Sequence, residues 1–132
     1  MSFIDWDESY SVGIKLIDKQ HQKLFALINA FHDGQQNLEE TLQDLLSYID
    51  FHFRTEEHYF DEFSYEDKAK HGQQHHFYEE RIHELCKRCL DEKKCDEQVS
   101  DETQEFVRDW ITHNIKISDK EYTACFQKHG LV

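Results

Sequence analysis

The sequence has no proline and only four glycines among its 132 residues. Both residues interrupt helices, so their scarcity, with little alternation of β-branched residues, favours an all-α protein. No apolar run approaches the roughly 20 residues of a membrane span, and the N-terminal stretch MSFIDWDE has no basic, apolar signal region. We therefore expect a single cytoplasmic domain over residues 1–132.

Positive charge is also scarce: 15 Lys and Arg stand against 28 Asp and Glu, giving a formal net charge of −13. Such a charge argues against nucleic acid and against anionic membrane surfaces as partners, and it favours solubility and the attraction of cations. The sequence does not define an oligomeric state, and a monomer is the default expectation.

The four cysteines, in a cytoplasmic protein, are expected to be reduced thiols. Cys86 and Cys89 form a C-x-x-C pair, a spacing used for zinc binding and redox chemistry, but no second pair accompanies it. We therefore interpret Cys86, Cys89, Cys95 and Cys125 as small apolar residues.

Apolar residues at helical spacing predict four helices joined by short connections. Such connections favour an antiparallel up-down-up-down four-helix bundle. We expect N-caps at Asp18, Asn37 and Ser100, and an end to the first helix at Gly34. The predicted helices cover about 18–33, 37–63, 66–93 and 100–118. Residues 1–16, with Phe3, Trp6 and Tyr10, are expected to form an N-terminal arm packed across the bundle.

Metal-ligand residue types recur on the predicted inner faces. The stretch YIDFHFRTEE places His52 and Glu56 four residues apart, and KHGQQHH does the same for His71 and His75. Four residues advance a helix by ~40° of rotation and ~6 Å of rise, so each pair points from one face. Taken singly, each of these residues is more often an ordinary core or surface residue.

Their depth along the bundle makes the set more specific. The residues in question alternate between the early part of one predicted helix and the late part of the next. In antiparallel helices this alternation places all of them at one end of the bundle. The set comprises His21, His52, Glu56, His71, His75, His113 and Asp119. Histidines with two carboxylates suit a pair of borderline metal ions, and the same groups without metal would be buried polar atoms lacking partners.

Four stretches together resemble the bacterial hemerythrins. They are IDKQHQKLF, Y-x-x-x-HF-x-x-EE, H-x-x-x-H and DWITHNIKISDKEY, and the resemblance runs from Trp6 to about Tyr122. It implies a four-helix bundle with a non-haem di-iron centre that reversibly binds dioxygen. It also implies that Glu56 and Asp119 bridge two iron ions. His21 and His52 would hold the iron that receives dioxygen, and His71 and His75 the other, with Trp110 and Ile111 lining the pocket.

One position departs from that family pattern. The family's last histidine, five residues before the bridging aspartate, corresponds here to Asn114, and a histidine stands one residue earlier at His113. In a regular helix Asn114 faces the site and His113 is rotated by ~100°. A π-bulge would instead bring His113 inward as a ligand; the regular helix is the expectation.

Two classes of function compete at such a centre. The first is a binding protein for dioxygen carriage, storage or sensing, with Phe25, Phe31, Phe53 and Phe60 keeping the pocket dry. The alternative is an enzyme that uses the position left open by Asn114 to reduce peroxide, nitric oxide or nitrite, or to oxidise ferrous iron. A structural zinc bundle is weaker, because such sites seldom need bridging carboxylates.

Overall fold

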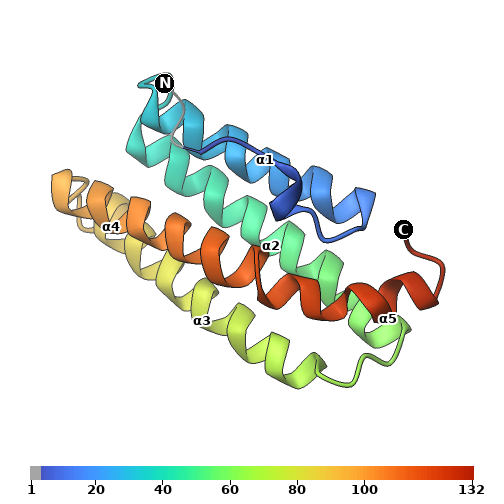
Figure 1. Cartoon of the computed structure of the whole chain (residues 1–132). Helices are drawn as coiled ribbons and strands as arrows, with labels where there is room; N and C mark the ends of the chain where they lie inside the picture. Colours follow the sequence, from blue (N-terminus) through green and yellow to red (C-terminus); the bar gives the residue numbers. More distant parts are fainter. Residues whose placement is uncertain (1–3) are drawn as a thin grey trace.

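The computed structural model describes residues 4–132, and over that range every regular element is a helix. Four long helices run alternately up and down along one axis (Figure 1), which confirms the predicted antiparallel bundle. They are α1 (Lys15–His32), α2 (Leu38–Glu62), α3 (Lys68–Cys86) and α4 (Glu97–Asp109).

Short elements extend two of these helices and close one end of the bundle. α3 continues into the π-helical turn η2 (Lys87–Asp91), and α4 into the π-helical segment η3 (Trp110–Ile115). After η3, the 3-10 helix η4 (Ser118–Tyr122) and α5 (Thr123–Lys128) lie near the start of α1 and the end of α2 (Figure 1).

Capping explains where α2 begins and where α1 ends. The Asn37 side chain accepts a hydrogen bond from the Glu40 N–H at 2.8 Å, which starts α2 as predicted. α1 ends in a Schellman turn, because Gly34 has a φ of +78° and the Gln35 N–H donates to the Ala30 carbonyl at 2.9 Å.

Two helix starts differ from the predictions. α1 begins at Lys15, and the Asp18 carboxylate instead accepts hydrogen bonds from the Val12 N–H and the Ser11 hydroxyl, which fixes the end of the arm. α4 begins at Glu97 with Asp96 as its cap, accepting from the Val99 N–H, rather than at Ser100. Asp and Ser are comparably good caps, so residue type alone does not choose between them.

The N-terminal arm packs on α1 as expected. The rings of Trp6 and Tyr10 lie 5.4 and 5.0 Å from that of Phe25, and the Ile4 backbone pairs with the Asn29 amide. The η1 turn (Glu8–Tyr10) forms part of this arm. Phe3 lies outside the described residues.

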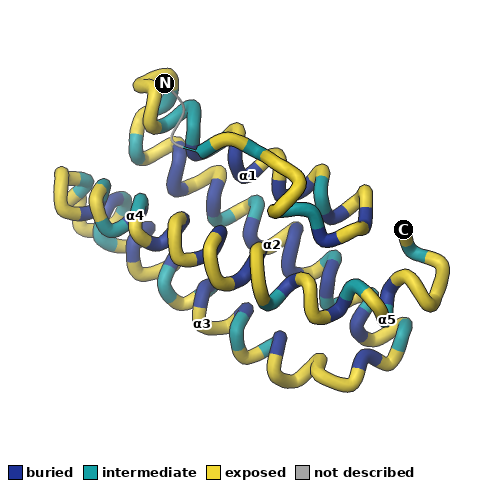
Figure 2. The backbone as a smooth tube through the Cα atoms, viewed as in Figure 1, coloured by how far each residue is buried: buried dark blue, intermediate teal, exposed yellow. Residues whose placement is uncertain are grey.

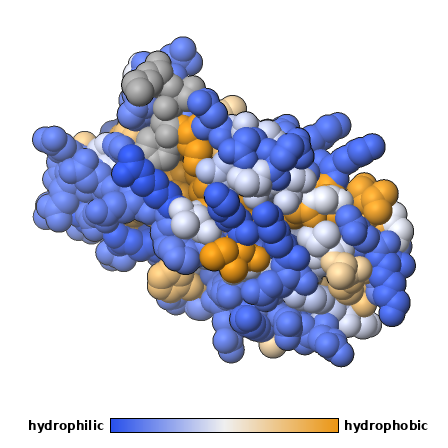
Figure 3. All heavy atoms as spheres, in the orientation of Figure 1, coloured by the Kyte–Doolittle hydropathy of each residue, from blue (hydrophilic) through white to orange (hydrophobic). Residues whose placement is uncertain are grey.

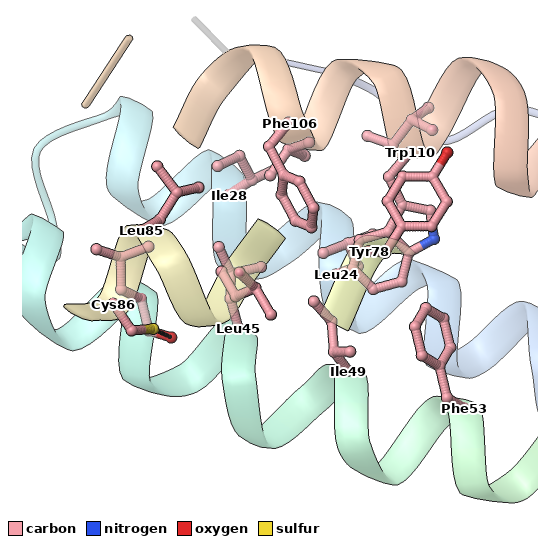
Figure 4. Close-up of a cluster of buried hydrophobic side chains, with 14 of the residues drawn as sticks. Leu24, Ile28, Leu45, Ile49, Phe53, Tyr78, Leu85, Cys86, Phe106 and Trp110 are labelled. Atoms are coloured by element: carbon pink, nitrogen blue, oxygen red, sulfur yellow. Dashed lines mark hydrogen bonds between the residues drawn. The ribbon is translucent and has the colours of Figure 1, made fainter. Parts of the chain in front are cut away.

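The buried residues follow the inner faces of the helices (Figure 2) and form two apolar clusters. The large cluster fills the half of the bundle near the α1–α2 and α3–α4 connections and reaches Phe53 and Trp110 (Figure 4). The small cluster closes the opposite end and consists of Val12, Ile14, Ile17, Phe60, Tyr65, Tyr122 and Phe126. Of the residues predicted to face inward, Phe31 is only partly buried.

The cysteines are not all free thiols, which corrects the expectation from the sequence. Cys89 and Cys95 form a disulfide across the α3–α4 connection, because that connection folds back and brings their Cα atoms to 4.0 Å. Cys86, the other half of the C-x-x-C pair, is a buried free thiol that contacts the Leu42 carbonyl.

The outer surface agrees with the charge balance. The face shown in Figure 3 is mostly hydrophilic, with apolar residues in separate patches. Over the described residues, no helix is long and apolar enough to cross a membrane.

Candidate metal centre

Six of the predicted ligand residues meet in one buried layer. His21 comes from α1, His52 and Glu56 from α2, His71 and His75 from α3, and Asp119 from η4. All six are at most 1% exposed. The layer therefore draws on α1, α2, α3 and the segment that follows α4.

On one side of the layer two imidazoles converge on one carboxylate. The Nε2 atom of His21 lies 3.0 Å from Oδ2 of Asp119 and 3.2 Å from Nε2 of His52. The His52 Nε2 atom lies 4.0 Å from the same Asp119 oxygen. These three residues present ligand atoms within 4.8 Å of one another. Two ring nitrogens that face each other and a carboxylate form a natural cation site.

Glu56 connects the α2 and α3 contributions. Its Oε1 atom is 3.1 Å from Nε2 of His52 and 3.2 Å from Nε2 of His75. His71 is oriented differently, because its Nε2 atom bonds the carbonyl of Ser118 at 2.9 Å and leaves Nδ1 without a partner. In this structure Nδ1 is therefore the nitrogen of His71 available to a metal.

Two side chains behind the layer fix the histidine rings. The Nδ1 atom of His52 lies 2.6 Å from Oε1 of Gln20, and Nδ1 of His75 lies 2.7 Å from Oε2 of Glu57. An acceptor at Nδ1 keeps the proton there and leaves Nε2 free as a ligand. The sequence analysis singled out neither Gln20 nor Glu57. The available signal was that each directly neighbours a predicted ligand in the chain, His21 and Glu56 respectively.

The carboxylates alter the protonation of these groups. Burial disfavours the charged form of His52, but Glu56 and Asp119 outweigh it and raise its pKa to about 9. Burial also opposes charge on His75, and the adjacent Glu56 and Glu57 carboxylates raise its pKa to about 9. Burial would raise the pKa of Glu56, yet His52 and His75 hold it well below its usual value. In the metal-free layer, these shifts favour the protonated forms of His52 and His75 at neutral pH.

The two apolar clusters enclose the layer from both ends. From the large cluster, the Phe53 ring stacks on His75 at 3.8 Å, and Trp110 lies 6.3 Å from His52. From the small cluster, Phe60 lies 5.3 Å from His71. Of the phenylalanines expected around the pocket, Phe53 and Phe60 touch the site. Phe25 packs under the arm instead.

The structure does not bring His113 into the layer. Its side chain is 64% exposed and pairs with Asp109 at 2.8 Å, whereas Asn114 is 1% exposed. The helix here is π-helical and not regular as expected, with the Lys116 N–H donating to the Ile111 carbonyl. At about 4.4 residues a turn, the residue four after Trp110 returns to the inner face, so the π segment keeps Asn114 inside.

The donor set fits a metal ion. Several buried polar atoms in the layer have no hydrogen-bond partner: both oxygens of Glu56 and of Asp119, Nε2 of His75 and Nδ1 of His71. Leaving such atoms unpaired costs about 1–3 kcal/mol each, and cations would offset that cost. Glu39, Cys89 and Cys95 form another group with ligand atoms in reach, but the disulfide occupies both sulfur atoms.

A four-helix bundle with histidines and carboxylates projecting into one interior layer is the architecture of dinuclear metal-binding bundles. The family model described as "Hemerythrin HHE cation binding domain" matches residues 12–125. The chain therefore belongs to the hemerythrin family, as its motifs suggested.

Relatives and solved structures agree with this membership. The chain is 31% identical over 118 residues to a "Hemerythrin-like protein" of Naegleria gruberi, covering 89% of each. It is 27% identical over 135 residues to a "Bacteriohemerythrin" of Methylococcus capsulatus, covering 95% of this chain and 98% of that protein. A crystal structure of a wild-type hemerythrin superposes with a TM-score of 0.81 at 25% identity, covering 94% of this chain and 98% of that one. This family indicates an iron-containing, oxygen-binding protein.

Proposed function

We propose that the chain holds two non-haem iron ions and binds dioxygen reversibly, for carriage, storage or sensing in the cytoplasm. Glu56 and Asp119 are the bridging carboxylates, His21 and His52 hold one ion, and His71 and His75 hold the other. The observation that carries this proposal is the buried convergence of these residues, in which both carboxylates and Nε2 of His75 have no hydrogen-bond partner. Bound iron would supply reversible electron transfer to dioxygen.

The protein's own residues provide the conditions for binding without turnover. Phe53, Phe60 and Trp110 enclose the layer and exclude water, which protects a reduced centre from side reactions. Gln20 and Glu57 hold the imidazoles in place, so the ligand geometry is preset before any metal arrives.

Iron analysis with optical spectra tests this function. Protein purified in air should contain about two irons per chain and show near-ultraviolet charge-transfer bands. Cycling reduced protein between oxygen and argon should change and restore the spectrum. A chain that binds iron but consumes dioxygen irreversibly would contradict reversible binding.

His113→Ala provides the matched control for the ligand assignment. The His113 side chain is solvent-exposed and paired with Asp109, so its removal should leave iron content and spectrum unchanged. Loss of iron in this variant would mean that His113 is a ligand after all.

The second candidate function is an enzyme that reduces peroxide, nitric oxide or nitrite, or oxidises ferrous iron. Asn114 favours it, because a buried amide in place of an imidazole is a weak donor. Repeated turnover with one of these substrates, at a rate above that of free iron in solution, distinguishes the enzyme from the carrier.

A further inference from the structure

The side of the layer formed by α3 and η3 contains an unusual group of polar atoms. Both amide atoms of Asn114 are buried without a hydrogen-bond partner, and so is Oε1 of Gln74. None of these atoms belongs to the ligand set proposed above. They lie on the flank of the layer that carries His71 and His75.

The contacts around Asn114 locate it opposite α3. Before it in the chain, the Trp110 ring lies 5.9 Å from that of Tyr78. After it, the Ser118 carbonyl bonds His71. Because η3 and α3 run in opposite directions, Asn114 lies between these two contacts, and His75 lies between Tyr78 and His71. Asn114, which is 1% exposed, therefore lies inside the bundle at the level of His75.

A surface hollow lies where η3 and α3 lie side by side. It has a volume of about 380 Å³ and is lined by Lys70, Gln73, Gln74, Phe77, Tyr78, His113 and Ser118. Lining residues Gln74, His113 and Ser118 are chain neighbours of His75, Asn114 and the bridging Asp119. The hollow thus approaches the layer from the α3 side. Lys70 is one of its lining residues, and its ammonium group pairs with Glu121 at 3.4 Å.

Counting donors shows what this side of the layer lacks. His71 and His75 with two bridging carboxylates would give the ion held by α3 four protein donors. His21 and His52 with the same two carboxylates would give the other ion four as well. Ions of this kind take about six ligands, so both ions keep positions that the protein does not fill. Two divalent ions also carry more positive charge than two carboxylates neutralise, which favours an anion at an unfilled position.

We propose that a small inorganic anion, of the class of azide or nitrite, enters through this hollow. It binds at the position beside Asn114, on the ion held by His71 and His75. The Asn114 amide nitrogen donates a hydrogen bond to it. The inference rests on the proposed di-iron function and adds a second exogenous-ligand position to it.

Azide titration of the oxidised, iron-loaded protein tests the proposal, with stoichiometry read by calorimetry and optical spectra. The wild type should bind about two azides per two irons, one on each ion. Asn114→His supplies a third imidazole on this side and should reduce the stoichiometry to about one. Asn114→Ala should keep about two, with weaker binding of one of them because its hydrogen-bond donor is gone.

Other outcomes separate the possible failures. One azide in the wild type and two in Asn114→Ala would show that the Asn114 amide itself occupies the position, which overturns the proposal. One azide in all three proteins also overturns it. Iron content is measured in every sample, so a wild type without about two irons refutes the proposed function instead.

The route is tested by charge reversal at Lys70, which lines the hollow. Lys70→Glu should slow association of the second azide about threefold at low salt, with the difference shrinking as salt is added. Lys128→Glu makes the same charge change away from this hollow and should have no such effect. Equal rates for both variants would exclude entry through the hollow.

Discussion

The two ends of the bundle interior are built on opposite principles. Near the α1–α2 and α3–α4 connections the interior is apolar, with Ile28, Leu45 and Leu85 fully buried in one cluster (Figure 4). Toward the other end, between this cluster and the small apolar one, histidines and carboxylates are just as deeply buried, and many of their atoms lack partners. The apolar end is stable through packing alone, whereas the polar layer needs bound cations to satisfy it.

A single helix face joins the two ends. On α2, Leu45 and Ile49 precede His52 and Glu56 on the same inner stripe, so packing at the apolar end fixes where the ligands point. The comparison teaches that the well-packed apolar half positions the ligand residues. Burying those polar residues is itself unfavourable until cations bind.

The largest expected effect comes from removing a ligand that both metal positions share. Glu56→Ala takes away the carboxylate next to both His52 and His75 and should lose most of the bound iron while the chain stays helical. Leu45→Ala should cost about 3 kcal/mol of unfolding free energy yet keep its iron. Iron analysis and chemical denaturation of both variants check this crossed pattern. Full iron content in Glu56→Ala would show that the centre lies elsewhere.

Metal removal should lower the stability of the polar layer more than that of the apolar end. Iron at a thousand times its dissociation constant stabilises the fold by about 4 kcal/mol, so chelation should lower the melting temperature by about 10 °C or more. Hydrogen exchange should speed up most around His21, His71 and Asp119, and least around Leu45 and Leu85. Equal melting temperatures with and without iron would mean that the layer is not a metal site.

Sequence patterns predicted the bundle and the layer because both follow from the spacing of apolar residues and from the order of the ligand residues along the chain. The helical spacing of apolar residues sets the inner faces, and the early-late alternation of ligands places them at one end whatever the exact boundaries. That is why His21 and Asp119 meet although 98 positions separate them in the chain.

The features that the sequence did not predict depend on local geometry. Asp96 and Ser100 are both acceptable caps, and only the path of the connection chooses Asp96. The same connection brings Cys95 to Cys89, a pairing that spacing does not reveal. Glu57 looks like a surface carboxylate until α3 places His75 against it.

A smaller effect on metal affinity is expected from Glu57, which contacts His75 on the side away from the other ligands. Glu57→Gln keeps an oxygen for the Nδ1 proton of His75 but removes the charge, and metal affinity should fall about tenfold. Glu79→Gln is the matched control, since Glu79 also pairs with Arg54 but does not contact His75. Competition with a chelator of known affinity measures both variants. Equal affinities for them would remove Glu57 from the support of the site.

The smallest effect belongs to the surface of the apolar end, where Glu102 on α4 bonds Arg81 at 3.0 Å and Arg88 at 2.7 Å. Hydrogen bonds from Arg88 and Arg81 lower the pKa of Glu102 to about 2. A carboxylate with a depressed pKa contributes stability above its unfolded-state pKa, near 4.5, and loses that contribution as the pH falls through about 2.

Glu102→Gln should therefore cost about 1 kcal/mol at pH 7, with the difference from the wild type shrinking toward pH 2. Denaturation of metal-free protein at several pH values gives this difference, and protonation in the polar layer cancels because both proteins share it. Glu84→Gln, which removes only the more exposed partner of Arg81, should change less. A difference that grows on acidification would assign the effect to another group. Metal affinity should be unchanged at neutral pH, because this contact acts through packing of α3 on α4 and lies outside the layer.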